Sequence, residues 1–375
     1  MITSSTKHNP EKKKRKTLLS RAGTAITCAL VMILILALAG CSSGTPTSSA
    51  ATSAASSSSA TTSSSATASD QASDASEDPE ARATAGANLV DKRVELISVI
   101  FRLAGHDELN VSKFAYQKEL DTTFASYKNH PAVTYAASKL SHIGPGYVLA
   151  FALHIKPDMS GLISDLSGLV GVFGDKWTSQ TITEFFPLVL DFYKDTKFND
   201  FYKSKESFYL SESKLFAEDK RVINLDKKWF LPWAERFDVA TKYDFVVSPS
   251  ISVANHAVRV ADVNYAVMSS NIDASLLPSG FLVHEYVHSF GDGIGIMWYM
   301  ENARVREIAE AANNPFYPDP MDVAIEYMVR SYTILYFADR GDTEAISILM
   351  KIDKSLGFAE IEEVYGLVRK FEKRD

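Results

Sequence analysis

Two histidines and a glutamate within residues 280–291 are the side chains of this sequence best suited to metal chemistry. The segment reads Gly-Phe-Leu-Val-His-Glu-Tyr-Val-His-Ser-Phe-Gly, with the pattern His-Glu-x-x-His at positions 284, 285 and 288. On a helix, His284 and His288 lie one turn apart on the same face, where their imidazoles can share one tetrahedral metal ion. Glu285 lies beside them and could take a proton from water that the metal activates. The alternative is an ordinary apolar helix that carries the pattern by chance.

A catalytic zinc site needs a third protein ligand, and the sequence favours a carboxylate. The chain has eight histidines, and none follows His288. This excludes a third histidine six residues after His288, because position 294 is isoleucine. Asp292 falls two residues too early for the variant that has aspartate in that place. The third ligand should therefore be a carboxylate farther along the chain.

Glu326 is the carboxylate that the sequence favours as this third ligand. The run 321–337 is apolar nearly all round, which predicts a buried helix, and Asp319 followed by Pro320 suits its start. A buried carboxylate must be paired or must bind a metal. An ion pair between Glu326 and Arg330 is the structural alternative, and both roles hold together if Arg330 supports a metal-binding Glu326. Weaker candidates lie on a segment expected to be a solvated helix: Glu301, Glu307 and Glu310.

The remaining segments predict an α+β fold that is mainly helical. Helical spacing of apolar residues recurs through 88–218, above all in four segments: 90–103, 114–127, 133–140 and 147–154. From 219 onward, short runs rich in Val, Ile and Tyr predict a small sheet directly before the helix of His284: 222–225, 244–248, 251–260 and 264–269. Gly291 suits the end of that helix, so Gly293 and Gly295 are expected in a mobile loop. One or two closing helices are expected within 343–373.

The first 40 residues have the layout of a bacterial export signal. Basic residues precede an apolar run at 25–39, and the chain continues through Leu38-Ala39-Gly40-Cys41. This tetrapeptide resembles a lipobox, and the resemblance implies cleavage before Cys41 and transfer of a diacylglycerol group to its sulfur. An uncleaved signal anchor is the alternative, although a run of about 15 apolar residues is short for a membrane span. We therefore expect an extracytoplasmic protein, attached to the bacterial cell membrane through lipid on Cys41.

The composition after the signal predicts a tether followed by one large domain. Residues 42–85 are mostly Ser, Thr and Ala, which predicts a disordered segment. Together with the lipidated Cys41 this segment forms a tether, whose root-mean-square reach is roughly 35–40 Å. The domain occupies 86–375, with a helical part at 88–218 and the sheet and active-site helices at 219–375. Removal of the signal changes the formal net charge from −7 to −13, because seven of its residues are basic and one is acidic. A chain this acidic is a poor nucleic-acid binder. With only two cysteines, Cys28 in the signal and Cys41, the mature chain has no disulfide.

Four stretches of the sequence resemble a bacterial family of secreted or lipid-anchored proteins with a zincin-like domain of unknown function: 94–105, 127–133, 284–290 and 325–331. The resemblance covers most of residues 88–350, and the last two stretches are its specific part. It implies a zincin-like fold and a gluzincin-type site, in which two histidines and a later glutamate hold zinc. It does not identify the group that stabilises the transition state, for which three tyrosines are candidates: Tyr299, Tyr317 and Tyr327.

These features together predict a membrane-anchored zinc metallopeptidase that acts on a peptide or protein substrate. His284, His288 and Glu326 would bind Zn²⁺, with Arg330 as the partner of Glu326. Glu285 would deprotonate the attacking water and deliver the proton to the leaving amine. The alternative is a non-enzymatic, surface-anchored binding or adhesion protein whose metal is structural or absent. A closed structural site needs a fourth protein ligand, which the lack of cysteine and of later histidines makes hard to supply.

Overall fold

The computed structural model describes residues 88–373, apart from 107–108, 110–113, 142, 167–168, 171–176, 253 and 313. The predicted export signal, Cys41 and the predicted tether lie outside the described residues. Within the described part of the chain, no helix is both long and apolar enough to cross a membrane. The predicted class is confirmed, since the structure is mainly helical with one small sheet.

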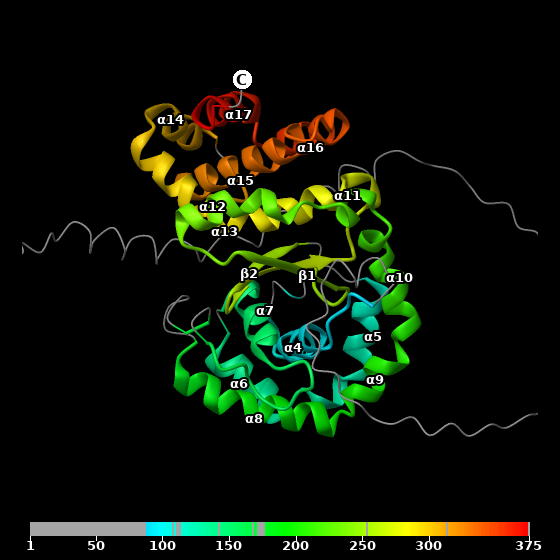
Figure 1. The fold of residues 1–375 in the computed structure, drawn as a ribbon. Coiled ribbons are helices and arrows are strands. Elements are labelled where there is room, and N and C mark those ends of the chain that lie inside the picture. Colours follow the sequence, from blue (N-terminus) through cyan, green and yellow to red (C-terminus); the bar gives the residue numbers. More distant parts are fainter. Residues whose placement is uncertain are drawn as a thin grey trace, which may run out of the picture.

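The sheet lies in the middle of the molecule and separates two groups of helices (Figure 1). Its strand order is β1-β3-β2, with β1 at Lys242–Ser248, β2 at His256–Val260 and β3 at Val263–Ser269. The central strand β3 runs parallel to β1 and antiparallel to β2, so β2 forms one edge of the sheet. A bridge between Val90 and Val247 places the start of the described chain along the other edge.

Helices from the N-terminal part of the chain cover the lower face of the sheet in Figure 1. Those of the lower group are α4 (Lys92–Leu103), α5 (Ala115–Thr123), α6 (Pro131–Lys139), α7 (Pro145–His154), α8 (Ser179–Asp195), α9 (Phe198–Ser204) and α10 (Glu206–Ala217). The helices predicted at 90–103, 114–127, 133–140 and 147–154 correspond to the first four, with a short 3-10 turn at Ala125–Tyr127 after α5. Their starts follow local chemistry, since the Asp91 carboxylate accepts a hydrogen bond from the Arg93 backbone at the start of α4.

The C-terminal helices stack in layers on the upper face of the sheet, with α13 nearest to it and α15 next (Figure 1). They are α11 (Lys220–Ile223), α12 (Leu231–Phe237), α13 (Pro278–Glu301), α14 (Ala303–Ala311), α15 (Pro320–Ala338), α16 (Thr343–Ser355) and α17 (Ile361–Phe371). The helix predicted at 321–337 is confirmed as α15, and the Asp319 carboxylate caps it by accepting a hydrogen bond from the Met321 backbone. The closing helices predicted within 343–373 are α16 and α17.

The strand predictions are confirmed at 244–248 and 264–269 and need correction elsewhere. Of the segment 251–260, only the last five residues form a strand. The strand predicted at 222–225 is wrong, because this segment begins within the short helix α11. The Asp219 side chain accepts a hydrogen bond from the Arg221 backbone and starts that helix, so a local cap outweighs a few β-branched residues.

The predicted end of the metal-site helix at Gly291 is also wrong. Helix α13 continues for ten residues past Gly291, to Glu301, and Gly293 and Gly295 lie inside it rather than in a loop. A glycine inside a helix costs up to about 1 kcal/mol relative to alanine. The close packing of α13 against α15 offsets that cost.

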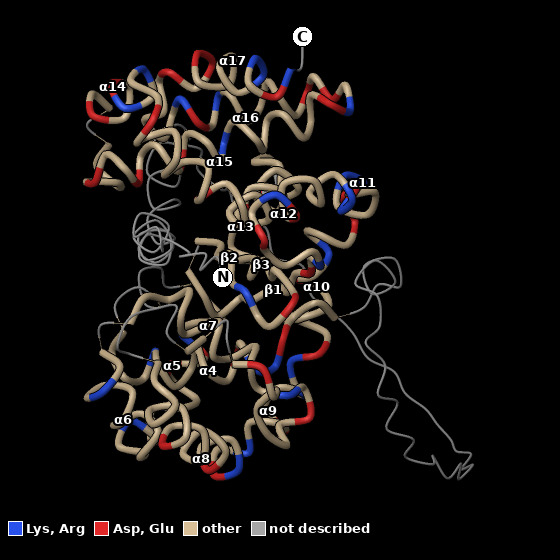
Figure 2. The backbone as a smooth tube through the Cα atoms, turned by 60° about the vertical axis from the view of Figure 1, so that its left-hand side comes forward, with Lys and Arg blue, Asp and Glu red and all other residues tan. Residues whose placement is uncertain are grey.

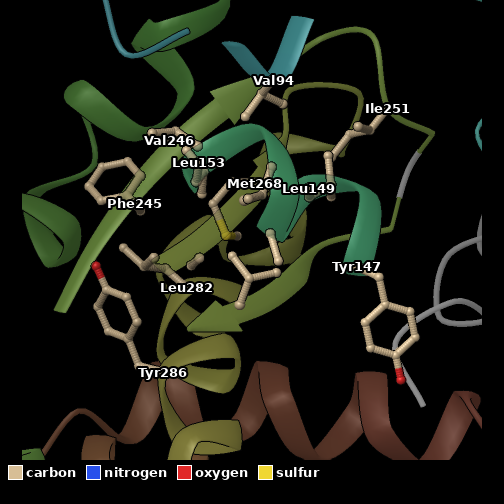
Figure 3. Packing of buried hydrophobic residues seen from close by; sticks show 14 of the residues in the cluster. Val94, Tyr147, Leu149, Leu153, Phe245, Val246, Ile251, Met268, Leu282 and Tyr286 are labelled. Atoms are coloured by element: carbon tan, nitrogen blue, oxygen red, sulfur yellow. The ribbon is translucent and has the colours of Figure 1, made fainter. Parts of the chain in front are cut away.

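The buried hydrophobic residues form one core that spans both faces of the sheet. Figure 3 shows Leu149 and Leu153 of α7 reaching the sheet from one side and Leu282 and Tyr286 of α13 from the other. Charged residues of both signs are interspersed along the outer helices (Figure 2). Helix α13 is therefore held between the sheet and α15, and its buried positions can carry polar groups only where these find partners.

Candidate metal centre

Helices α13 and α15 approach each other so closely at Gly295 that only glycine fits there, and the contact is tight at Gly291. A Cβ atom added at Gly295 would lie 2.4 Å from the Ile325 Cα, and one added at Gly291 would lie 3.0 Å from the Val329 Cγ2. Contacts below about 3 Å force atoms apart, so a larger side chain at Gly295 would push α15 away. Because Ile325 precedes Glu326, the glycines of α13 control how near Glu326 comes to the two histidines.

The crossing brings together the three ligands predicted from the sequence. The ligand atoms of His284, His288 and Glu326 all lie within 4.8 Å of one another, and all three residues are buried. The two Nε2 atoms are 3.1 Å apart. Glu326 Oε2 lies 3.7 Å from His284 Nε2, and Glu326 Oε1 lies 3.7 Å from His288 Nε2. Metal–ligand bonds of about 2.0–2.2 Å in a tetrahedron separate the ligand atoms by about 3.3 Å, so this group fits one metal ion.

Asp292 orients one of the two histidines, a role that the sequence analysis missed. His288 Nδ1 and Asp292 Oδ1 are 2.7 Å apart, which leaves Nε2 to face His284 and Glu326. A carboxylate on the far nitrogen fixes the tautomer and orientation of a metal-binding imidazole. The spacing of four residues between His288 and Asp292 on one helix could have indicated this contact, but Asp292 was considered only as a metal ligand.

The pKa values of the two histidines move in opposite directions. Burial lowers the pKa of His284 well below its ordinary value, and His288 and Arg330 lower it further. Burial also disfavours the charge on His288, but Asp292 and the nearby Glu326 and Glu285 outweigh it and raise its pKa to about 9. The carboxylates around His288 thus favour a positive charge at this position, as a cation-binding site requires.

Glu285 lies beside the three-ligand group with one carboxylate oxygen unused. The residue is buried, and Oε2 makes no hydrogen bond within the described structure. Burial raises its pKa to about 7; His288 opposes this rise, whereas Glu326 and Asp292 add to it. A hydrogen bond from the Ala257 backbone on the edge strand β2 also favours the charged form. A carboxyl group with a pKa near neutrality is suited to move protons in both directions.

Arg330 forms the predicted ion pair with Glu326 and also reaches a second carboxylate. Its Nη2 donates to Glu326 Oε2 at 3.1 Å, and its Nη1 donates to Asp353 Oδ1 in a short contact. Burial disfavours the charge of Arg330, but Asp353 and Glu326 outweigh it and raise its pKa above the ordinary value. Asp353 was not predicted from the sequence, although it lies four residues after Leu349 on the buried face of α16.

Of the three tyrosine candidates, Tyr317 alone is close enough to Glu326 for that carboxylate to influence its pKa. Its hydroxyl is buried close to the side chains of Glu326 and Arg330, without a well-formed hydrogen bond to either. The hydroxyls of the other two are engaged elsewhere, that of Tyr299 with Glu310 and that of Tyr327 with the Glu360 backbone. The weaker ligand candidates remain outside the site, since all are exposed: Glu301, Glu307 and Glu310.

Comparison with protein families, with curated proteins and with solved structures finds no match to this chain. The predicted resemblance to a zincin-like bacterial family therefore stays a prediction. What the structure itself provides is a buried group of two imidazoles and one carboxylate with the arrangement of metal ligands.

Proposed function

We propose that this protein is a zinc-dependent peptidase whose centre is formed by His284, His288 and Glu326. The observation that carries the proposal is Glu285, a buried carboxyl group with an unpartnered oxygen that follows His284 directly in the chain and is close enough to His288 and Glu326 for their charges to shift its pKa. Two imidazole nitrogens and one carboxylate oxygen suit zinc, and three protein ligands leave one position open. A structural zinc site would instead be closed by a fourth protein ligand.

The residues around the metal have different roles in peptide hydrolysis. Zinc, when bound, supplies a Lewis acid that polarises a carbonyl group and lowers the pKa of water. Glu285 removes a proton from the attacking water and then delivers it to the nitrogen of the leaving amine. Asp292 holds the His288 ring in the orientation and tautomer that binding requires.

The edge strand supports a peptide as the substrate. The Ala257 backbone on β2 reaches Glu285, so the edge of the sheet lies next to the reacting groups. Extended peptides bind to sheet edges through main-chain hydrogen bonds. A peptide in this position would present one of its backbone carbonyls to the centre.

Replacement of Glu285 tests the proposed role of this residue. Glu285→Gln keeps the size and polarity of the side chain but loses its basicity. We expect zinc content to be unchanged and hydrolysis of a mixed peptide library, followed by mass spectrometry, to fall by about 10²–10⁴-fold. Full turnover with zinc retained would remove Glu285 from the mechanism.

We further propose that the protein is exported and attached to the outer face of the cell membrane through lipid on Cys41. The support is the order of basic region, apolar region and lipobox-like tetrapeptide at the start of the chain. Cys41→Ser is expected to abolish the incorporation of labelled fatty acid and to move the protein out of the membrane fraction. Continued labelling of the Cys41→Ser protein would contradict this assignment.

A further inference from the structure

We propose that Asp353, acting through Arg330, is a positioning residue that sets the orientation of Glu326 and the net charge beside it, and thereby strengthens metal binding. This inference rests on the proposed zinc site. It concerns a residue on a different helix, α16, which does not itself contact the three ligands.

The three side chains form a continuous chain of charges in the interior. Arg330 donates to Glu326 from one nitrogen at 3.1 Å and to Asp353 from the other. The exposed fractions of the side chains are 1% for Glu326, 4% for Arg330 and 5% for Asp353. The Phe358 ring lies 4.1 Å from the Arg330 guanidinium carbon, which restricts the plane of the guanidinium group. The direction of its two hydrogen bonds is therefore fixed from outside the metal site.

The guanidinium group selects which oxygen of Glu326 is available. Each oxygen lies 3.7 Å from one histidine, Oε2 from His284 Nε2 and Oε1 from His288 Nε2, but Arg330 donates its hydrogen bond to Oε2 and leaves Oε1 without one from the guanidinium group. A carboxylate fixed through one oxygen presents the other in a defined direction, as expected for a ligand that binds through a single oxygen. Hydrogen-bond partners of metal ligands have this orienting effect in general.

Asp353 also determines the net charge that a metal ion meets. Without Asp353, Arg330 would place an uncompensated positive charge 3.1 Å from the Glu326 carboxylate and would compete with the metal for it. Burial raises the pKa of Asp353, and the charge and hydrogen bond of Arg330 oppose this rise. With Asp353 ionised, the three side chains together carry one negative charge. Because these groups are buried, water screens the effect only weakly.

The test compares the same substitution at the two ends of α16 in the full-length chain. Asp353→Asn removes the charge next to Arg330. Asp342→Asn removes a charge that pairs with Arg221, far from the site, and asparagine preserves the cap that Asp342 provides to α16. Zinc affinity is measured by competition with a chromophoric chelator, and ligand geometry by the visible absorption of bound Co²⁺. We expect Asp353→Asn to weaken zinc binding by about 10–100-fold and to change the Co²⁺ spectrum. Asp342→Asn should leave both unchanged.

A double variant separates the effect of charge from the effect of packing. It also serves as the test if Asp353→Asn does not fold. Arg330→Met with Asp353→Leu removes both members of the Arg330–Asp353 pair and leaves Glu326 as a buried carboxylate without its arginine partner, a charge that a bound metal ion would neutralise. Glu326 then keeps its charge but loses its orientation. We expect a changed Co²⁺ spectrum and an affinity between those of Asp353→Asn and the wild type, whereas a packing role predicts the weakest binding in the double variant.

The outcomes separate this inference from the proposed function. Wild-type affinity and spectrum in the folded Asp353→Asn or double variant would overturn the inference and leave the zinc site intact. Weaker binding in the double variant than in Asp353→Asn would overturn the charge argument. A wild-type protein that binds no zinc would overturn both the inference and the proposed function.

Discussion

Two buried carboxyl groups of this protein have pKa values raised to about 7, and their surroundings suit them to different roles. Glu285 has an oxygen with no hydrogen-bond partner within the described structure and is close enough to His288 and Glu326 for their charges to shift its pKa. Glu95 lies away from them and accepts hydrogen bonds on both oxygens, from Tyr116 at 2.8 Å and from Ser248 and Ser250 at 2.6 and 3.0 Å. A fully partnered carboxyl group is typical of a structural anchor, and an unpartnered one of a reactive group.

Glu95 should make the stability of the protein depend on pH. Burial raises its pKa from 4.5 to about 7, with the hydrogen bonds from Ser248, Tyr116 and Ser250 opposing this rise, so the folded state favours the protonated form. The resulting stabilisation is fully present below pH 4.5 and is lost as the pH rises toward 7. Relative to Glu95→Gln, the free energy of unfolding of the wild type should fall by about 3 kcal/mol across this range. Urea unfolding of both proteins from pH 4.5 to pH 8 measures this difference, and a difference that does not change with pH would contradict the prediction.

At the scale of elements, the crossing of α13 and α15 is what converts a sequence pattern into a site. The pattern at 284–288 places two imidazoles on one helix face, but Glu326 reaches them only because Gly295 lets the α15 backbone approach at Ile325. From the sequence, Gly291 was expected to end the helix, and Gly293 and Gly295 were expected in a loop. In a single sequence, a glycine that ends a helix and one that admits a neighbouring helix look alike, since the neighbour is not visible.

Gly295→Ala should therefore damage the metal site from outside it. The added methyl group would meet the Ile325 backbone at 2.4 Å, and α15 must shift to relieve the clash. We expect the free energy of unfolding to fall by about 1–3 kcal/mol and zinc binding to weaken. Gly293→Ala is the matched control, because its methyl group would meet only the Phe237 ring at 3.6 Å. That variant should bind zinc normally and be slightly more stable, since alanine favours helix. Equal effects of the two substitutions on zinc affinity would contradict the argument.

At the scale of the whole molecule, the sequence was sufficient for features that local pattern determines. The apolar run with its Asp319 cap predicted α15, and the Val-rich runs predicted β1 and β3. The three candidate ligands followed from spacing and from the absence of later histidines. Features that depend on contacts between distant elements could not be predicted from the sequence. Asp353 lies on α16, and nothing near it in the sequence indicates that it meets Arg330.

The layered arrangement explains why those distant contacts matter. Helix α13 lies between the sheet and α15, and α16 lies beyond α15 (Figure 1). Each layer contributes to the centre: the edge strand through the Ala257 backbone, α13 through the histidines, α15 through Glu326, and α16 through Asp353. The centre is thus assembled by tertiary packing, although its ligands are recognisable from local patterns.

The measurement that most directly tests this account is the zinc content of residues 86–375, purified without chelator or added metal, beside two single variants. The account predicts about one zinc ion per chain in the wild type and its loss or marked weakening in Glu326→Ala. Glu310→Ala, which removes an exposed glutamate outside the group, should keep its zinc. If the wild type holds no zinc and takes up none on titration, the pattern at 284–288 belongs to an ordinary buried helix. The protein would then be better understood as a binding or adhesion protein.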